Sequence, residues 1–388
     1  MKIKQDPADF RVEELTDLRP GSNGPFALYR LEKRGWTTPD AIGVIRRRWK
    51  LPLARVAWGG LKDRHAETRQ FISIYRGPRR GLDQRGIRLE YLGQVTHPYS
   101  ARDIRGNRFE ITVRNLEVTA ATAALAATEA LRSTGLPNYF DDQRFGSVGD
   151  ERDFIARRMV RGEFEQALFL ALAAPYAHDR GAAAHDKAIL RANWGRWPEC
   201  KALLTRSHAR SLVDYLCHHP EDYRGAVARL RPELQGLYLS AFQSYLWNAI
   251  LEDWIATSFP ADELLRLSLR LGQYPAPRRL TTEQLETWRS RRLPLPAARW
   301  PFDPSAPWAS SALRVLEREQ LQWHDLRIRG LRKPFFTRGE RNAWCLLDDL
   351  AAEVRDDDRH PSRSALCLQF TLPRGSYATL ILKRLLAG

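Results

Sequence analysis

Apolar and polar residues alternate with a period of two in three segments, at residues 71–75, 107–114 and 366–372. This period puts successive side chains on opposite faces of an extended chain, so all three segments are predicted to be β-strands. In the last segment, four apolar residues share one face: Leu366, Leu368, Phe370 and Leu372. We expect that face to pack in a core.

Other segments carry apolar residues at helical spacing. One helix is predicted to begin at Thr38, which offers an N-cap and is followed by a proline. The alanine-rich stretch 118–134 predicts a second helix, stopped by Gly135. Two further helices are predicted at 163–173 and 237–257.

Strand patterns therefore prevail at the start of the chain, helical patterns in the middle, and a strand pattern returns at the end. Residues 264–271 alternate weakly, and the Pro- and Arg-rich segment 274–307 is predicted to hold few regular elements. A chain of 388 residues usually forms more than one core. The order indicates a strand-rich domain with a helical domain inserted in it, and a C-terminal strand that rejoins the first sheet.

The charge of the chain changes this picture by pointing to a partner. Sixty-two Lys and Arg against forty-six Asp and Glu leave a net charge of +16. Cationic side chains neutralise phosphates and release counterions, so this balance favours a nucleic-acid partner. The alternative is a basic protein that uses its charge for solubility. No apolar stretch reaches the length that crosses a bilayer, so we expect a cytoplasmic protein without membrane contact.

Candidate metal ligands are sparse. The four cysteines form no Cys-x-x-Cys pair, and the one local cluster, 217–219, holds adjacent Cys and His side chains that cannot easily converge on one ion. We predict no metal site.

Residues 59–70 form the densest polar segment of the N-terminal half. Two glycines open it, so Asp63 is predicted to project from a tight loop. Lys62 and Arg64 flank this carboxylate, and Arg69 could fold back toward it. Nearby cations lower the pKa of a carboxyl group, and an ionised carboxylate is what a nucleophile needs. The alternative is a solvated turn with ordinary surface ion pairs.

Three further segments combine polar and aromatic residues. Residues 137–146 interleave Asn, Gln and Arg with aromatic rings, a mixture that suits base edges and stacking but also a buried turn. Residues 240–248 form part of a helical stripe with polar exceptions, and residues 372–379 form a turn before a closing helix.

The order and wording of these segments resemble the TruD family of tRNA pseudouridine synthases. Residues 3–14 look like the family's Lys-containing opening with Asp-Phe-x-Val. Residues 60–70 match Gly-x-Lys-Asp-x-x-Ala-x-Thr-x-Gln at every fixed position. Residues 138–146 resemble Asn-Tyr-Phe-Gly-x-Gln-Arg-Phe-Gly, except that Asp141 replaces the first Gly, and Leu-Pro-x-Gly-Ser-x-Ala-Thr closes the chain. If that Gly has a positive φ, Asp is among the better-tolerated substitutes.

The resemblance implies an α+β fold. A pseudouridine-synthase catalytic domain with a mixed, largely antiparallel sheet is expected from residues 1–155 and 344–388. An inserted, mainly helical TRUD domain is expected at residues 156–343.

The resemblance also implies the activity, the isomerisation of a uridine in tRNA to pseudouridine, with uridine 13 of tRNA-Glu as the usual bacterial target. Asp63 would be the catalytic carboxylate, attacking the ribose or the base or acting as a base at the sugar. Phe10, Asn138 and Phe370 match residues that hold the substrate in the family, and Phe140 could add a further aromatic wall. Lys4 and Arg64 are the candidate cations that orient Asp63 or a phosphate. Two of the rings could flank the uracil while the Asn138 amide pairs with its polar edge. No cofactor is needed, and we expect a monomer.

Two other functions remain compatible with the residues. One is a catalytically silent tRNA-binding protein or RNA chaperone. The other is a nuclease that would need clustered carboxylates for Mg²⁺. The acidic runs available for such a site are 141–142, 348–349 and 356–358.

Overall fold

The structure is a computed structural model that describes residues 2–149, 152–176, 179–331, 335–347 and 349–387. Contacts between Cα atoms divide the chain into two compact units. Unit 1 comprises Met1–Leu136, Arg278–Thr281 and Trp344–Gly388, and unit 2 comprises Pro137–Pro277 and Thr282–Ala343. The sequence prediction put the two boundaries at 155/156 and 343/344.

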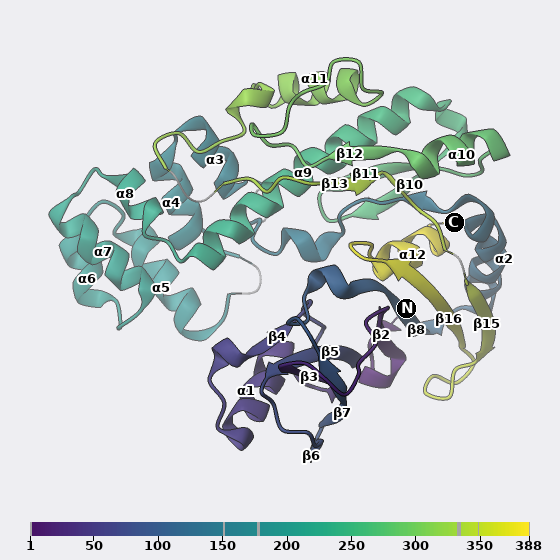
Figure 1. Cartoon of the computed structure of the whole chain (residues 1–388). Coiled ribbons are helices and arrows are strands. Elements are labelled where there is room, and N and C mark those ends of the chain that lie inside the picture. Colours follow the sequence, from purple (N-terminus) through teal and green to yellow (C-terminus); the bar gives the residue numbers. More distant parts are fainter. Residues whose placement is uncertain (1, 150–151, 177–178, 332–334, 348, 388) are drawn as a thin grey trace. The chain divides into compact units, whose positions relative to one another are not determined.

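Unit 1 is built on a ten-stranded sheet with the order β15-β16-β8-β2-β5-β3-β7-β6, to which β1 adds beside β8 and β4 beside β5 (Figure 1). Its strands are β1 (Lys2–Ile3), β2 (Phe10–Thr16), β3 (Phe26–Arg34), β4 (Val56–Trp58), β5 (Glu67–Tyr75), β6 (Leu82–Gln84), β7 (Ile87–Val95), β8 (Ile104–Leu116), β15 (Ala351–Asp356) and β16 (Ser364–Pro373).

The sheet mixes both strand directions. β2 and β5 run parallel, and the other pairs described within this sheet run antiparallel. The predicted mixed, largely antiparallel sheet is therefore confirmed. The C-terminal strand β16 pairs with β8, so the last strand does rejoin the first sheet. All three alternating segments lie in strands, although β5 begins four residues before the predicted segment 71–75.

Helix α1 (Thr38–Trp49) packs on the sheet beside β3, β5 and β7. Its N-cap is Thr37 rather than Thr38, because the Thr37 hydroxyl accepts the amide of Asp40. The side chain of Thr38 is instead buried inside the unit, where it acts on the neighbouring loop. Threonine at two successive positions made the cap ambiguous in sequence.

Helices α2 (Val118–Thr134) and α12 (Ala378–Leu385) contact each other, and α2 also lies against β15 and β16. The predicted bounds of α2 are confirmed at both ends. It ends because Gly135 adopts φ 66°, and a Cβ there would lie 2.5 Å from the carbonyl oxygen of Cys345. The closing helix is also confirmed.

Unit 2 is mainly helical. Its helices are α3 (Ile155–Arg161), α4 (Phe164–Leu172), α5 (Gly181–Ala192), α6 (Trp197–Leu203), α7 (His208–His218), α8 (Tyr223–Ala228), α9 (Pro232–Ser258), α10 (Thr282–Ser290) and α11 (Ala309–Arg318). Its strands form two antiparallel pairs, β10 (Leu264–Leu269) with β11 (Gly272–Pro277) and β12 (Arg292–Pro294) with β13 (Glu340–Asn342). The short strands β9 (Leu136–Pro137) and β14 (Trp344–Cys345) lie in the segments where the chain passes from one unit to the other.

The longest helix, α9, is buried along most of its length, which explains why its apolar residues do not keep to one stripe. The predicted scarcity of regular elements in 274–307 is wrong in part, because α10 and β12 lie there. Within the described parts of the chain, no helix is both long and apolar enough to pass through a membrane.

Candidate active site

One row of directly opposed residues crosses the sheet of unit 1. It runs from Phe370 on β16 through Phe109 on β8, Val12 on β2 and Thr68 on β5 to Lys33 on β3. Residues opposed in a ladder point to the same face of the sheet. Two phenylalanines, a valine, a threonine and a lysine from five strands therefore share one face, although they come from distant parts of the sequence.

Asp63 lies in the loop between β4 and β5, at the Lys33 end of this row. Both of its carboxylate oxygens are bound: Oδ1 accepts the backbone amide of His65 at 3.0 Å, and Oδ2 is paired with the ammonium of Lys4. The first contact closes a turn of the kind that Asp forms with the amide two residues on. About a third of the Asp63 side chain, 34%, stays exposed, so a substrate can reach the carboxylate.

Lys4 lies 59 residues before Asp63 in the sequence, and its ammonium pairs with the Asp63 carboxylate. Its ammonium also lies over the ring of Phe10, 4.3 Å from the centroid. The backbone of Lys4 adopts φ 60°, which is uncommon for a residue with a side chain and persists where the surroundings require it. One cation thus joins a buried ring to a carboxylate.

The pKa of the Asp63 carboxyl is set by opposing effects. Burial favours the neutral form, but the hydrogen bonds from Lys4 and from the His65 amide, with the charge of Lys4, outweigh burial and hold the pKa below its usual value. Asp63 is therefore ionised at neutral pH, the state that nucleophilic or base chemistry requires.

Two buried polar side chains, Thr38 and Gln70, hydrogen-bond to the backbone of the loop that carries Asp63. The Thr38 hydroxyl accepts the Lys62 amide at 3.0 Å and donates to Gln70 Oε1 at 2.8 Å. Gln70 Nε2 in turn donates to the Gly60 carbonyl at 3.1 Å. Neither Thr38 nor Gln70 is exposed to solvent. Buried hydrogen bonds of this kind are costly to break, so they fix the path of the loop backbone.

The Lys62 side chain links the loop to strands β2 and β8. Its ammonium lies 2.9 Å from Glu14 Oε2 and donates to Asn107 Oδ1 at 2.5 Å. The other oxygen of Glu14 accepts from the hydroxyl of Tyr99 at 2.9 Å. Glu14 is almost fully buried, so this is an interior ion pair and not a surface one.

The rings of Phe10 and Phe370 both contact Phe109. Phe10 meets Phe109 edge to face with centroids 6.1 Å apart, and Phe109 stacks on Phe370 at 5.5 Å. All three rings are buried. Phe10 and Phe370 thus belong to a continuous aromatic row with Phe109 between them, rather than to an open pair of rings.

The other cations near Asp63 in sequence point elsewhere. Arg64 donates from Nε to the Gly35 carbonyl at 3.2 Å, and Arg69 pairs with Glu32 at 3.1 Å. Arg69 does not fold back because β5 begins at Glu67, and the strand alternation turns residue 69 to the opposite face.

Asn138 and Phe140 belong to unit 2. Asn138 is buried; its amide nitrogen donates to the Asn342 carbonyl at 3.0 Å, and its oxygen accepts from Arg341 at 2.8 Å. The Arg341 guanidinium also lies 4.2 Å from the centroid of Phe140. Asn248 on α9 binds both backbone groups of Phe140, each at 2.8 Å. The segment is therefore an organised, buried turn.

Asp141 has φ −90°, an extended conformation open to any residue, so its presence in place of the family's Gly causes no backbone strain. It is also buried, so it presents no carboxylate at the surface. The neighbouring Asp142 accepts the Arg270 amide at 2.8 Å.

In the other acidic runs, Asp349 and Asp357 accept hydrogen bonds from residues of unit 1. Asp349 accepts the amide and hydroxyl of Thr371, whereas Asp348 lies outside the described residues. Asp357 is buried against Arg114 rather than solvated as a loop residue. Across the ranges that the structure describes, no three His, Cys, Asp or Glu side chains gather as a metal would require.

Comparison with known proteins identifies the family. Residues 1–385 match the family model described as tRNA pseudouridine synthase D (TruD). The chain belongs to the TruD family. It is 30% identical to a TruD homologue of Methanocaldococcus jannaschii over all of this chain and 92% of that one. It is 27% identical to the tRNA pseudouridine synthase D of Leptospira interrogans over 99% and 95% of the two chains.

The crystal structure of a TruD protein from Methanosarcina mazei has a TM-score of 0.75 to this chain, at 26% identity over 99% of this chain and 93% of that one. As a TruD protein, the chain is an isomerase that converts uridine in tRNA to pseudouridine. The resemblance noted in the sequence is thereby confirmed.

The TruD signature now has a physical explanation. Besides Asp63, its fixed residues are buried or bound: Lys62 pairs with Glu14, Gln70 holds the Gly60 carbonyl, and Ala66 and Thr68 are buried. Gly59, next to the signature, has no room for a side chain, since a Cβ would lie 2.6 Å from Ile104 Cδ1. The other fixed residues of the signature therefore hold the loop that carries the Asp63 carboxylate.

Sequence reasoning missed three residues that contact the candidate residues: Lys33 binds the Asp63 carbonyl, Phe109 contacts Phe10 and Phe370, and Arg341 binds Asn138. Lys33 carried a signal, because it stands in the buried phase of β3, where Ala27, Tyr29 and Leu31 precede it. Phe109 was assigned only to a strand face. Arg341 carried no local signal, since its partners Asn138 and Phe140 lie some 200 residues away in sequence.

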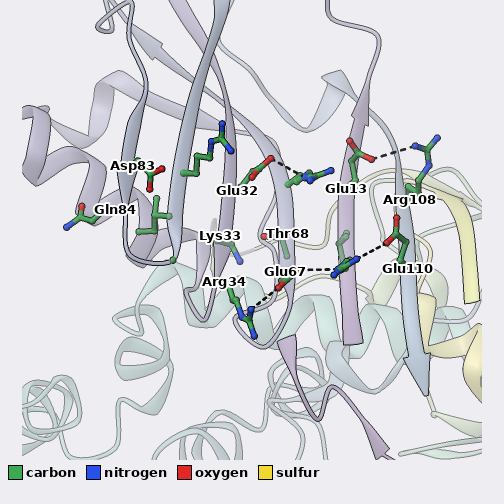
Figure 2. A pocket seen from close by; sticks show the side chains of 16 residues that line it. Glu13, Glu32, Lys33, Arg34, Glu67, Thr68, Asp83, Gln84, Arg108 and Glu110 are labelled. Carbon is green, nitrogen blue, oxygen red and sulfur yellow. Dashed lines mark hydrogen bonds and ion pairs between the residues drawn. The ribbon is translucent and has the colours of Figure 1, made fainter. Parts of the chain in front are cut away.

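The opposite face of the sheet carries a hollow of about 520 Å³ (Figure 2). Its charges alternate in sign from strand to strand: Arg34, Glu67, Arg11 and Glu110 form one chain of ion pairs at 3.1–3.5 Å. Arg69 pairs with Glu32 at 3.1 Å. Figure 2 also shows the pair of Glu13 with Arg108. Asp63 is not among the sixteen lining residues. The hollow thus lies over a sheet face whose opposite charges pair with one another.

Proposed function

We propose that Asp63 is the catalytic carboxylate of this pseudouridine synthase and that its substrate is uridine 13 of a tRNA, with tRNA-Glu as the expected bacterial case. The observation that carries the assignment of Asp63 is its ion pair with Lys4 at the centre of the matched family signature. An ionised, partly exposed carboxylate on a loop held by buried hydrogen bonds is suited to attack a fixed atom.

The reaction breaks the N1–C1′ bond of the uridine, turns the uracil and rejoins it to the ribose through C5. Whether Asp63 adds to the ribose, adds to the base or removes a proton from the sugar, the uridine must leave its stack to reach it. Lys4 keeps Asp63 ionised and directed. Because its contacts are to Asp63 and Phe10, Lys4 orients the carboxylate rather than a phosphate.

The remaining substrate contacts are assigned by family resemblance. Phe10 and Phe370 would form an aromatic wall with Phe109 for the uracil, supported by their ring contacts. Asn138 and Phe140 would contact the substrate from unit 2. Since the Asn138 amide is bound to Arg341 and Asn342 here, pairing with a base requires exchange of these contacts. Arg64, exposed in the Asp63 loop, is assigned to a phosphate.

We assign unit 1 as the catalytic domain and unit 2 as the inserted TRUD domain. We also propose that the protein works as a monomer in the cytoplasm without a cofactor, because neither the reaction nor the residues assigned above call for one.

The experiment that tests this function is pseudouridine mapping at single-nucleotide resolution on unmodified tRNA, incubated with the protein without metal or nucleotide. We expect pseudouridine at position 13 of tRNA-Glu with the wild type. Asp63→Asn keeps the shape of the side chain and removes its charge, so we expect it to abolish the product while tRNA affinity stays within a few-fold.

Each alternative has its own result. Pseudouridine at another position would correct the substrate and keep the enzyme. Product formed by Asp63→Asn would refute the catalytic assignment. Tight binding without product on any tRNA would favour the RNA-binding alternative.

A further inference from the structure

A buried lysine that the mechanism above does not use lies beneath the Asp63 loop. Lys33 is only 3% exposed, and its ammonium donates three hydrogen bonds. All three acceptors are backbone carbonyls: Trp36 at 2.9 Å, Lys62 at 3.2 Å and Asp63 at 2.8 Å. Two of the three belong to the loop, and one of them is the carbonyl of Asp63 itself.

This arrangement is unusual for a lysine. Fully buried Lys is rare without an anionic partner, because desolvation of the ammonium is costly. Here no carboxylate lies within ion-pair distance of Lys33 among the described residues; the charge is met by carbonyl dipoles. Burial lowers the pKa of Lys33 to about 8, against the opposing effect of the Asp63 charge. If the site were only structural, an apolar residue would fill it without the free-energy cost of desolvating an ammonium.

From its position on β3, Lys33 reaches both the β3–α1 turn and the Asp63 loop. It lies opposite Thr68 in the row that also contains Phe109 and Phe370, so its stem is fixed by the sheet. The ammonium then joins the β3–α1 turn, through Trp36, to the loop at residues 62 and 63. The same loop is held at Gly60 and Lys62 by Gln70 and Thr38. Lys33 supplies the support at the position where the carboxylate itself projects.

We propose that Lys33 is a positioning residue for Asp63: its ammonium binds the carbonyls of Lys62 and Asp63 and so fixes the direction of the carboxylate. The inference rests on the proposed role of Asp63. Lys33 touches neither substrate nor the reacting atoms. A displaced carboxylate should lower the rate more than the affinity, because the rate depends on the position of the reacting group, whereas affinity for a nucleic acid comes mainly from charge contacts to many phosphates.

The test is Lys33→Met, which keeps the length of the stem and removes the ammonium. We expect the single-turnover rate of pseudouridine formation at saturating enzyme to fall at least about tenfold, while the Kd for tRNA changes less than about threefold. The matched control is Lys50→Met, which removes an exposed lysine of the same unit and should change neither quantity.

Hydrogen exchange gives a readout that needs no activity. In Lys33→Met, amides of residues 59–66 should exchange faster, while β3 and β5 stay protected. A rate within twofold of wild type, unchanged exchange in the loop, or a parallel loss of tRNA affinity would overturn the proposal.

If Lys33→Met does not fold, Lys33→Gln, which retains two donors, is measured instead, with an intermediate loss of rate expected. Unfolding of both variants would make Lys33 a stability residue and would also refute the proposal. If the wild type forms no pseudouridine on tRNA, the proposed function fails first, and the exchange measurement still decides whether Lys33 holds the loop.

Discussion

Asp63 and Lys4 form an ion pair in which each partner is only partly covered, with 34% and 18% of the side chains exposed. Exposed pairs contribute little to stability, so the value of this one lies in the direction and charge state of the carboxylate. The positive φ of Lys4 fits that reading, since backbone strain is often retained where function needs a fixed geometry.

Lys4→Met should move the acid limb of the rate profile. Without the hydrogen bond and charge of Lys4, less opposes the effect of burial, and the pKa of Asp63 rises. Because the ionised form is the active one, the acid limb of the single-turnover rate should shift to higher pH, and the loss relative to wild type should be larger at pH 5 than at pH 8. Lys2→Met, two residues away on β1, is the control. An unshifted limb would show that Lys4 does not set the ionisation of Asp63.

At the scale of elements, the polar sheet face in Figure 2 is ordered by register. Arg11 on β2 lies opposite Glu67 on β5 and Glu110 on β8, so one arginine separates two carboxylates. Opposite charges across strands stabilise a sheet, whereas like charges destabilise it. The alternation also keeps the parallel β2–β5 pair in register.

Arg11→Glu should therefore destabilise unit 1, by about 1–2 kcal/mol, since it sets three carboxylates side by side. Chemical denaturation followed by circular dichroism measures the loss. The double variant with Glu110→Arg restores an opposite pair between β2 and β8 and leaves the Arg34–Glu67 pair intact, so it should recover part of the stability. Equal stability of the double and single variants would mean that the cross-strand charges do not interact.

A second element-level link ties the β15–β16 turn to β8. Arg114 on β8 donates to Asp357 at 3.0 Å and to Asp9 at 2.8 Å, and Asp357 also accepts the Asn115 amide at 2.7 Å and pairs with His360 at 2.9 Å. Burial opposes ionisation, but these donors outweigh it and hold the pKa of Asp357 far below its usual value.

The sign of the pH effect follows from that shift. A carboxyl group whose pKa is depressed on folding stabilises the protein above its unfolded pKa, and this stabilisation is lost as the pH falls toward the folded value. Asp357→Asn should cost about 2–4 kcal/mol at pH 7, because a neutral amide replaces the buried anion that accepts from Arg114, the Asn115 amide and His360. The difference from wild type in urea denaturation should shrink below about pH 4. A difference independent of pH would mean that the charge of Asp357 is irrelevant.

For the whole molecule, the net charge of +16 governs encounter with tRNA rather than chemistry. Affinity for tRNA should fall steeply with salt, by about a thousandfold between roughly 50 and 200 mM if six phosphates are neutralised. The single-turnover rate at saturating enzyme should stay nearly constant over the same range. Titration by filter binding, alongside rapid-quench kinetics, separates the two; a rate that falls in parallel with affinity would place salt-sensitive contacts in the chemical step.

The sequence alone predicted most of the regular elements whose pattern is local. The bounds of α2 follow from alanine content and a terminal glycine, and β8 and β16 follow from alternation. It also identified the family and nominated Asp63, because the signature around it is long and continuous. Elements such as α10, within a Pro- and Arg-rich stretch, were missed because composition concealed their period.

Only the tertiary structure decided which cations meet Asp63. Its sequence neighbours Arg64 and Arg69 turn away, because a loop and a strand direct their side chains by backbone geometry and not by proximity in sequence. Lys4, which follows β1, and Lys33 on β3 are brought to the Asp63 loop by the pairing of distant strands. Strand register depends on pairings between segments far apart in the chain, which no local pattern specifies.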